Sequence, residues 1–336
     1  MMWTTKLMVD GVWQGDVVDT PQIAAKRARS ARAFRGEVRA DGAGPHPSEA
    51  GRYHLFVSYA CPFAHRVILA HRLKRLDGIV GLSVVHPRWN TSHGWVFGDT
   101  PLSTPDRSGE GFTHLHQAFS ASKPDYTGRV TVPVLWDKAA RRIVSDDSRA
   151  ILSMLNSAFD RVGGDSTVDL LPRALQPEIA ALSDEIASEI AAGVYRVGGA
   201  VDQDAYDAAE TALFAALDRQ ETRLADGRAF LHGTSVTESD ILLFTPLVRF
   251  EAVYAPLFRA LRRRLSDYPC LWTWVKRMDS LPGVHETVRF DHILPHYYDG
   301  WAPRNSRIVP AWHLARTCEK RRLQMPSLRG LTFWQI

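Results

Sequence analysis

The sequence predicts two domains, an α/β domain in the first half of the chain and an all-α domain in the second. Between residues 53 and 159, short runs rich in Val, Ile and Leu alternate with helical patterns. From residue 173 onward, apolar residues recur at the spacing of one helix face. The length of 336 residues is sufficient for two hydrophobic cores. We expect a Gly- and Pro-containing linker between them, over residues 161–172.

The first domain is expected to span residues 51–160, after an irregular N-terminal arm over 1–50. Its predicted elements, in chain order, are a strand at 54–58, a helix at 62–76, a strand at 79–86, a long loop over 87–127, strands at 129–136 and 143–144, and a helix at 147–159. This β-α-β-loop-β-β-α order is that of a thioredoxin-like domain.

The second domain is expected to be helical throughout residues 173–318, followed by a basic and then apolar tail over 319–336. One-face spacing of apolar residues predicts helices over 177–192, 204–224 and 271–278. The segment Thr237-Glu238-Ser239-Asp240 resembles a capping box and predicts a further helix start. We assign this segment a role in folding rather than in chemistry.

Composition and charge limit the classes of function. The net charge is +4, and the densest basic run, Arg262-Arg263-Arg264, is expected to be a solvated helix face. The sequence has no basic stretch with interleaved aromatic residues, so we do not expect nucleic-acid binding. A mildly basic chain suits small anionic substrates. Three cysteines predict a reducing, cytoplasmic location, and no apolar run approaches a membrane span, so we expect no membrane association.

The most informative residue is Cys61, which an apolar strand precedes and a helix follows, with Pro62 at its first position. The positive end of a helix lowers thiol pKa values from about 8.5, so we expect a reactive thiolate at Cys61. His65 and Arg66 follow within one turn and are expected to add positive potential. The alternative is a buried, inert cysteine, because free Cys packs as a small apolar residue.

A Cys-x-x-Cys pair is excluded, because Ala64 stands three residues after Cys61. A disulfide formed at Cys61 then has no neighbouring thiol to resolve it, and a second thiol must come from a diffusible molecule. The histidines, including the pair His114 and His116, lack the spacing of a convincing metal site. We therefore expect monothiol chemistry without a metal or a permanently bound cofactor.

Several motifs together resemble the glutathionyl-hydroquinone reductases, the Xi-class and omega-like glutathione transferases. They span roughly residues 33–310 and are Cys61-Pro62-Phe63-Ala64-His65-Arg66, Gly94-Trp95-Val96-Phe97, Val132-Pro133-Val134-Leu135-Trp136-Asp137, and His296-Tyr297-Tyr298 with Ile308-Val309-Pro310. The resemblance implies a glutathione transferase fold, in which a thioredoxin-like domain binds the thiol and the helical domain binds the second substrate. It also implies a homodimer.

The resemblance implies a set of thiol-binding residues. Val132 offers its backbone to the cysteinyl part of the tripeptide, and Pro133 has a cis peptide bond. Asp147 and Ser148 hold the γ-glutamyl ammonium and carboxylate at a helix start, although a plain helix cap also explains them. Trp95 forms a wall of the site, or is simply a buried core residue. Arg129 completes the set of residues that contact the thiol.

The resemblance also implies an aromatic substrate pocket. Its catalytic residues are Cys61 together with Tyr195 and Tyr297, whose hydroxyls protonate or stabilise the departing hydroquinone. Phe63, Tyr254 and Tyr298 line the pocket, although any single Tyr also fits an apolar core. Phe63 replaces the Trp usual in the family, and Asp147 replaces Glu. The shorter Asp147 leaves open whether the thiol is glutathione or another low-molecular-weight thiol.

We therefore expect an enzyme that removes glutathione, or a related thiol, from a glutathionyl-hydroquinone through a mixed disulfide at Cys61. Its partners are a small thiol and an aromatic conjugate. Two alternatives remain open. A conjugating glutathione transferase uses a hydroxyl, such as that of Ser58 or Tyr59, in place of the cysteine. A non-catalytic thiol-binding or interaction module carries an inert Cys61.

Overall fold

A mixed four-stranded sheet forms the centre of the N-terminal half of the molecule, which a computed structural model describes over residues 4–31, 33–89 and 92–300. Its strand order is β4-β3-β5-β6. β3 pairs in parallel with β4 and antiparallel with β5, and β5 pairs antiparallel with β6. The strands and helices of this half are β1 Thr4–Val9, β2 Val12–Val18, α1 Pro21–Ser30, β3 Tyr53–Val57, α2 Pro62–Leu73, β4 Val80–Val84, α3 His116–Ser122, β5 Val134–Asp137, β6 Arg142–Ser145 and α4 Ser148–Ser157.

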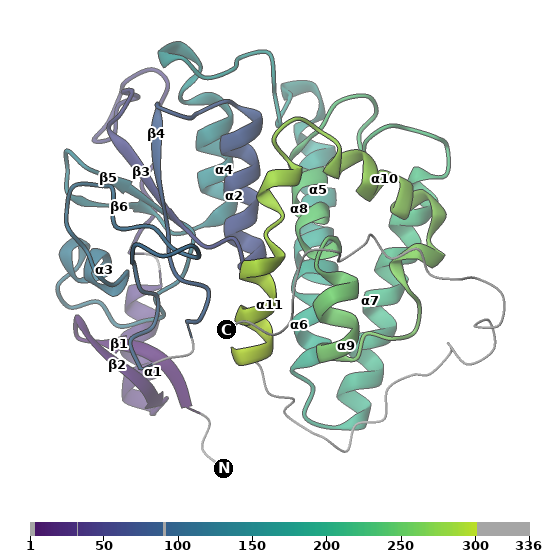
Figure 1. Cartoon of the computed structure of the whole chain (residues 1–336), viewed down its shortest axis with the longest axis horizontal. Coiled ribbons are helices and arrows are strands. Elements are labelled where there is room, and N and C mark those ends of the chain that lie inside the picture. Colours follow the sequence, from purple (N-terminus) through teal and green to yellow (C-terminus); the bar gives the residue numbers. More distant parts are fainter. Residues whose placement is uncertain (1–3, 32, 90–91, 301–336) are drawn as a thin grey trace.

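The thioredoxin-like order β3-α2-β4-β5-β6-α4 is confirmed. α2 and α4 lie together on one side of the sheet, and α3 lies against β6 on the other side (Figure 1). β3 is buried along its whole length, and its sequence is apolar except for His54, whose Nε2 lies 2.8 Å from Ser83 Oγ. β5 starts at Val134, five residues later than expected at 129, because Pro133 has no N–H to donate to a ladder. The long loop contains one short helix, α3.

The expectation of an irregular arm over residues 1–50 is wrong for its first part. β1 and β2 form a hairpin whose two-residue turn, Asp10-Gly11, has positive φ at both positions. An Asp-Gly pair between apolar runs is a strong hairpin signal, so the sequence contained this information. Gly11 also lies so close to Pro124 that a Cβ would stand 1.7 Å from its carbonyl oxygen. The hairpin thereby packs on the segment that leads to Pro133.

The C-terminal half is helical, as predicted. It packs beside the sheet domain, and α11 runs along the boundary between the two halves (Figure 1). Short one-turn helices occur at Asp160–Val162, Arg173–Leu175, Leu265–Asp267 and at His285–Thr287, which is η6. The longer elements are α5 Gln176–Glu185, η3 Ile186–Ala191, α6 Gly193–Gly198, α7 Gln203–Leu224, α8 Glu238–Leu247, η4 Phe250–Tyr254, α9 Ala255–Phe258, α10 Pro269–Asp279 and α11 Phe290–Gly300. The expected tail and Ile308-Val309-Pro310 lie outside the described residues.

Contrary to the expectation that no apolar run approaches a membrane span, one segment, Glu238–Phe258, is long and apolar enough to cross a membrane by length and composition. In the structure 72% of its most apolar window is buried. It contains α8, which packs against α2, α5 and η3, and η4, which packs against α9 and α11. Burial on all sides explains why this helix is apolar on every face.

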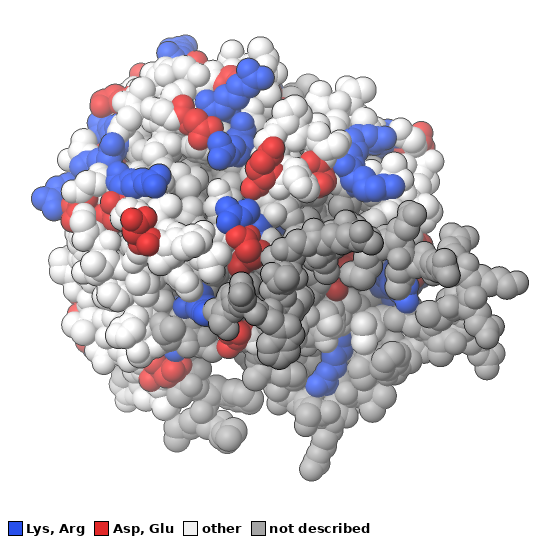
Figure 2. Space-filling model, in the orientation of Figure 1, with Lys and Arg blue, Asp and Glu red and all other residues white. Residues whose placement is uncertain are grey.

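Surface charges are interspersed on the face that Figure 2 shows, and its described part carries no continuous basic stripe. The basic run at 262–264 is neutralised in part by α7. Arg262 Nε donates to Glu210 at 3.0 Å, and Arg263 Nη1 donates to Asp218 at 2.6 Å. The expectation of a helix face is wrong, because the run lies in the bend between Phe258 and Leu265, where two of its arginines pair with acids of α7.

The predicted capping box at the start of α8 is confirmed, and its acid does more than cap. Asp240 is fully buried and accepts the backbone N–H and the hydroxyl of Thr237 at 2.9 and 2.8 Å. It also accepts the N–H of Leu231 at 2.8 Å and the indole N–H of Trp274 at 3.1 Å. One carboxylate thus joins the start of α8 to α10 and to the loop after α7.

We expect Asp240→Ala to lower the free energy of unfolding of the helical half by about 3 kcal/mol or more. Each buried donor that loses its partner costs roughly 1–3 kcal/mol. The matched control is Asp202→Ala, which removes an exposed carboxylate that caps α7 through Ala205 and should cost about 1 kcal/mol. Urea unfolding followed by tryptophan fluorescence measures both. Equal losses in the two variants contradict this account of Asp240.

Candidate active site

Cys61 lies where β3 turns into α2, at the boundary with the helical half. Its backbone is extended, with φ −76° and ψ 122°, and Pro62 occupies the first helical position, as predicted. The Sγ atom is 3.7 Å from the carbonyl oxygen of Val132, to which the thiol donates. The residue keeps a partly exposed surface. The thiol is thus held between the helix start and the segment before β5.

Arg249, which is not among the site residues expected from the sequence, fixes this turn to the helical half. It is fully buried and follows α8 directly. Its Nη2 donates to Tyr59 O at 2.8 Å and its Nε donates to Ala60 O at 3.1 Å. The same side chain bonds Thr245 O at 2.7 Å and His65 Nδ1 at 3.0 Å. A lone Arg inside an apolar helical segment was the only sequence signal for this role.

His65 does not supply positive charge, contrary to expectation. Burial and the neighbouring Arg249 hold the pKa of His65 well below its ordinary value, so the ring is neutral. Because Nδ1 accepts from Arg249, the proton resides on Nε2, which donates to Thr287 Oγ1 at 2.7 Å. Thr287 in turn donates to Val284 O at 2.6 Å. This directed chain ties α2 to η6, so His65 acts in structure.

The expectation that the pKa of Cys61 lies well below that of a free thiol is also wrong. Although part of the residue is exposed, the protein atoms around its sulfur raise the pKa of Cys61 above the ordinary value. The backbone N–H groups of Phe63 and Ala64, and the charges of Arg249 and Arg66, act in the opposite direction. Desolvation therefore outweighs the helix N-terminus and the two cations at this site.

The segment expected to bind the thiol lies next to Cys61. The peptide bond between Val132 and Pro133 is cis, as the resemblance predicts. Trp95 is nearly buried and stacks on His296 of α11, with ring centroids 5.6 Å apart and planes 8° apart. Its other stacking partner is Trp89, at 5.9 Å. The helical half therefore supports the Trp95 ring, and its role as a wall of the thiol site stays a prediction.

Asp147 is the N-cap of α4, and Ser148 begins the helix. Asp147 Oδ1 accepts the N–H groups of Arg149 and Ala150, both at 3.0 Å, and Oδ2 accepts from Arg35 at 3.0 Å. Burial favours the neutral acid, but these N–H groups and Arg35 hold the pKa of Asp147 below its ordinary value. The plain cap is thus present, and binding of an ammonium group stays a prediction.

Arg129 is exposed, and no hydrogen bond or ion pair joins its side chain to the described residues. Its backbone oxygen accepts the hydroxyl of Tyr126 at 2.9 Å. The structure therefore places Arg129 near the thiol segment along the chain, without a side-chain contact that fixes its role.

Three tyrosines from three helices meet opposite this site. The hydroxyls of Tyr195, on α6, and Tyr297, on α11, are 2.6 Å apart, and the hydroxyl of Tyr254 is 3.4 Å from that of Tyr297. Burial raises the pKa of all three, so each keeps its proton at neutral pH. Phe63 stacks on Tyr195 with centroids 6.3 Å apart. Phe63 thus links the helix that carries Cys61 to the tyrosine cluster.

The structure does not bring Tyr298 into this cluster. Its side chain is half exposed, and its hydroxyl donates to Ala252 O at 3.1 Å. On α11, Tyr297 and Tyr298 point about 100° apart because consecutive helical residues do so. Only Tyr297 therefore faces the other two tyrosines.

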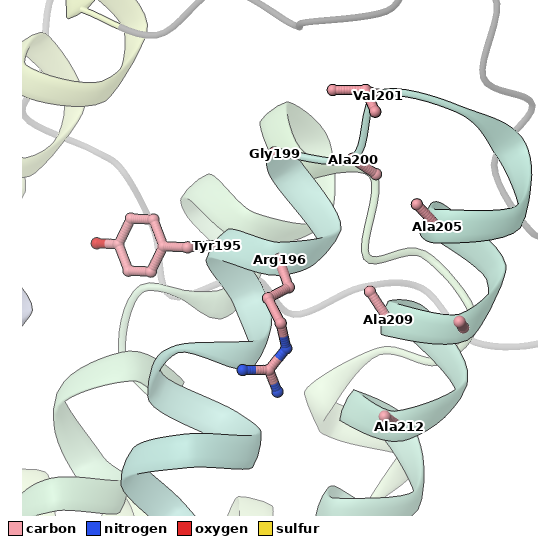
Figure 3. A pocket seen from close by; sticks show the side chains of 9 residues that line it. Tyr195, Arg196, Gly199, Ala200, Val201, Ala205, Ala209 and Ala212 are labelled. Carbon is pink, nitrogen blue, oxygen red and sulfur yellow. The ribbon is translucent and has the colours of Figure 1, made fainter. Parts of the chain in front are cut away.

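A separate groove of about 650 Å³ runs between α6 and α7. Tyr195 borders it, but the Tyr195 ring points away from the alanines that line the other wall (Figure 3). The alanine-lined wall consists of Ala205, Ala208, Ala209 and Ala212. The groove is therefore distinct from the site that contains Cys61. No group of three or more His, Cys, Asp or Glu residues among the described ones has a metal-binding arrangement.

Comparison with known proteins agrees with this geometry. The model of the glutathione S-transferase N-terminal domain matches residues 60–158, and that of the C-terminal domain matches residues 203–277. The glutathionyl-hydroquinone reductase YqjG of Escherichia coli K12 is 42% identical over 299 residues, covering 87% of this chain and 90% of that protein. The glutathionyl-hydroquinone reductase PcpF of Sphingobium chlorophenolicum is 40% identical, covering 90% and 95%.

Solved structures show the same relation. The glutathione-bound structure of YqjG aligns with a TM-score of 0.78 at 40% identity, covering 88% of this chain and 91% of that one. A Xi-class glutathione transferase from Natrialba magadii aligns with a TM-score of 0.80 at 38% identity, covering 87% and 88%. With two matching domains and relatives above the identity that marks a common family, the chain belongs to the glutathione transferases, in the group of the Xi-class glutathionyl-hydroquinone reductases.

Proposed function

We propose that the protein is a glutathionyl-hydroquinone reductase that uses Cys61 as its nucleophile and glutathione as its co-substrate. The observation that carries this proposal is a monothiol cysteine at a helix start that faces a cluster of protonated tyrosines from the second domain. The family relation and the glutathione-bound structure of a relative support glutathione as the thiol. A hydroquinone ring is the aromatic group that the names of the relatives indicate.

In the first step the Cys61 thiolate attacks the sulfur that joins glutathione to the ring. A sulfur–sulfur bond forms, the carbon–sulfur bond breaks, and its electron pair stays on the ring carbon. That carbon takes a proton, for which the hydrogen-bonded hydroxyls of Tyr195 and Tyr297 are suited because burial keeps them protonated. The reduced hydroquinone leaves, and Cys61 remains in a mixed disulfide with glutathione.

In the second step the thiolate of another glutathione molecule attacks the glutathione sulfur of the mixed disulfide. Cys61 leaves as a thiolate, and glutathione disulfide is released. The ring carbon gains two electrons and a proton, and two glutathione sulfurs, one from the conjugate and one from the second thiol, supply those electrons. Among the described cysteines, Cys270 lies on α10 rather than on the turn that holds Cys61, which fits resolution by a diffusible thiol.

The conjugating alternative needs a hydroxyl that faces the bound thiol. Ser58 is fully buried, and its Oγ accepts the N–H of Ala60 at 3.3 Å. The Tyr59 ring lies against His292 and beneath Arg289. Both residues are therefore engaged in the fold, and this observation disfavours conjugation as the main activity.

Two features of the proposal rest on the family and the composition alone. We propose that the enzyme is a homodimer in the cytoplasm, where glutathione is reduced and the sparse cysteines stay as thiols. Light scattering on the purified full chain tests the dimer.

Cys61→Ser is expected to abolish release of hydroquinone from a glutathionyl-hydroquinone, because a hydroxyl cannot form the mixed disulfide. Intact mass after exposure to glutathione disulfide should show one glutathione adduct on the wild type and none at this position in the variant. Cys270→Ser is the matched control and should keep both the turnover and the adduct. Near-normal turnover by Cys61→Ser contradicts the mechanism, and conjugating activity gained by that variant is compatible with it.

Asp147→Asn and Ser148→Ala should raise the KM for glutathione about tenfold or more while kcat changes little. These groups act at the end of the thiol that is remote from sulfur, so their loss removes binding shared by ground and transition states. Asn is nearly as good an N-cap as Asp, so Asp147→Asn separates the charge from the capping role. A fall in kcat at unchanged KM is the opposite outcome and removes these residues from the thiol site.

Tyr297→Phe should lower kcat about 100-fold with little change in KM, because it removes the hydroxyl that bridges Tyr195 and Tyr254. Tyr298→Phe is its matched control on the same helix, since that hydroxyl donates to Ala252 O instead. Steady-state turnover of a glutathionyl-hydroquinone measures both variants. Equal effects of the two changes show that the tyrosine cluster has no special part in proton transfer.

A further inference from the structure

Arg66, one turn after Cys61 on α2, is a buried cation with few partners. Its side chain is 3% exposed and lies over the ring of Phe63, with the guanidinium carbon 4.7 Å from the ring centroid. Its one hydrogen bond to a described residue runs from Nη1 to the hydroxyl of Ser148, at 3.4 Å. The Nε and Nη2 atoms are buried and have no hydrogen-bond partner among the described residues.

Arg249 approaches the same turn from the helical half and also has no carboxylate partner among the described residues. Its four hydrogen bonds go to three backbone carbonyls and the neutral ring of His65. Neither Arg66 nor Arg249 forms an ion pair with any acid in the described ranges. Two positive charges are therefore buried near one cysteine without a neutralising side chain.

This arrangement is unusual within the molecule itself. Arg52 is 2.8 Å from the fully buried carboxylate of Asp137, and Arg149 is 2.9 Å from that of Glu238. An isolated buried ion costs several kcal/mol, so partners of this kind are the rule. Arg66 and Arg249 depart from this rule. Their charges need an anion, and no described carboxylate supplies one.

Cys61 is the group that can supply this anion. Both guanidinium groups attract its thiolate, and the N–H groups of Phe63 and Ala64 point at its sulfur. The carboxylates at the starts of α4 and α8 are already engaged. Asp147 binds Arg35 and the first turn of α4, and Glu238 binds Arg149.

We propose that Arg66 is a positioning residue for the reaction: with Arg249 it forms a buried cationic pair whose counter-ion is the Cys61 thiolate. The pair stabilises that thiolate as the attacking group and again as the leaving group when a second thiol resolves the mixed disulfide. This inference rests on the proposed use of Cys61 as the nucleophile. Arg249 also holds the turn to the helical half, so Arg66 is the member of the pair that a variant can remove.

The other titratable side chains packed around the site that lack a charge near pH 7 come from four elements. His65, on α2, is kept neutral by burial and by Arg249. The tyrosines of α6, η4 and α11 are kept protonated by burial, namely Tyr195, Tyr254 and Tyr297. Burial lowers the pKa of Arg66 itself to about 10, while Arg149 and Glu238 act on it from α4 and α8 with opposite signs, so Arg66 is charged near pH 7. A change in the ionisation of Cys61 after loss of Arg66 therefore reports the Arg66 charge.

The test is the rate of Cys61 alkylation by iodoacetamide from pH 6 to 10.5, in a Cys270→Ser and Cys318→Ser background. It uses neither glutathione nor a quinone, so its outcome is independent of the reductase activity. Arg66→Gln should move the midpoint of the profile upward by about one pH unit, which is tenfold in thiolate fraction at low pH. A more basic thiolate is intrinsically more nucleophilic, so the net rate at pH 7.5 should fall about threefold while the plateau rate rises.

The alkylation rate thus falls at pH 7.5 and rises at the high-pH plateau. This result distinguishes the loss of the Arg66 charge from structural damage, which changes the rates at all pH values in one direction. Arg66→Lys keeps a charge and should restore most of the wild-type profile. Arg72→Gln removes an exposed arginine of the same helix that pairs with Asp77, and should leave the profile unchanged. A midpoint in folded Arg66→Gln equal to that of the wild type overturns the proposal.

A second pair of variants tests the counter-ion without altering Arg66. Cys61→Asp places a fixed carboxylate at the nucleophile position, and Cys61→Asn places a neutral group of the same shape there. Both residues are good N-caps. At pH 7.5 the Asp variant should unfold at the higher temperature, because its charge meets two unpaired guanidinium groups. An Asp variant that unfolds at the same or a lower temperature overturns the proposal, whether or not Arg66→Gln folds.

Discussion

The fully buried guanidinium of Arg249 is the contact on which the site depends. It donates to the carbonyls of Tyr59 and Ala60, directly before Cys61, and to the ring of His65, four residues after it. These bonds come from the helical half, so the turn that presents Cys61 takes its position from both domains. Because the acceptors are backbone carbonyls and a neutral ring, no negatively charged group compensates the charge of Arg249. The same side chain therefore supplies both position and positive potential.

The two-domain arrangement explains why the chemistry is assembled at the boundary. The sheet domain provides a thiol at a helix start, the Val132 carbonyl and the cap of α4. The helical domain provides three tyrosines whose hydroxyls form a chain from Tyr195 through Tyr297 to Tyr254. α11 serves both sides, since His296 stacks on Trp95 while Tyr297 joins the tyrosines. Any motion that separates the domains would therefore break the stack of His296 on Trp95 and move the tyrosine hydroxyls away from Cys61.

Local features of this fold were predictable from the sequence, and non-local ones were not. Three such local features are the start of α2 at Pro62, the cap at Asp147 and the capping box at Asp240. Each depends on only a few consecutive residues, because backbone sterics and unpaired N–H groups determine where a helix starts. The hairpin turn at Asp10 is equally local, although the expected irregular arm did not include it. By contrast, the role of Arg249 depends on partners 184 to 190 residues away along the chain. No short-range pattern encodes such a partner.

The pKa of Cys61 shows how the same limit affects function. A helix start and nearby basic residues are visible in the sequence and predict a lowered pKa. Burial is a property of the assembled domains, and here it acts more strongly than the favourable charges and raises the pKa. His65 changes in the same way, from an expected cation to a neutral link, because both halves enclose it. What remains to stabilise a thiolate are the guanidinium groups of Arg66 and Arg249, neither of which forms an ion pair with a described acid.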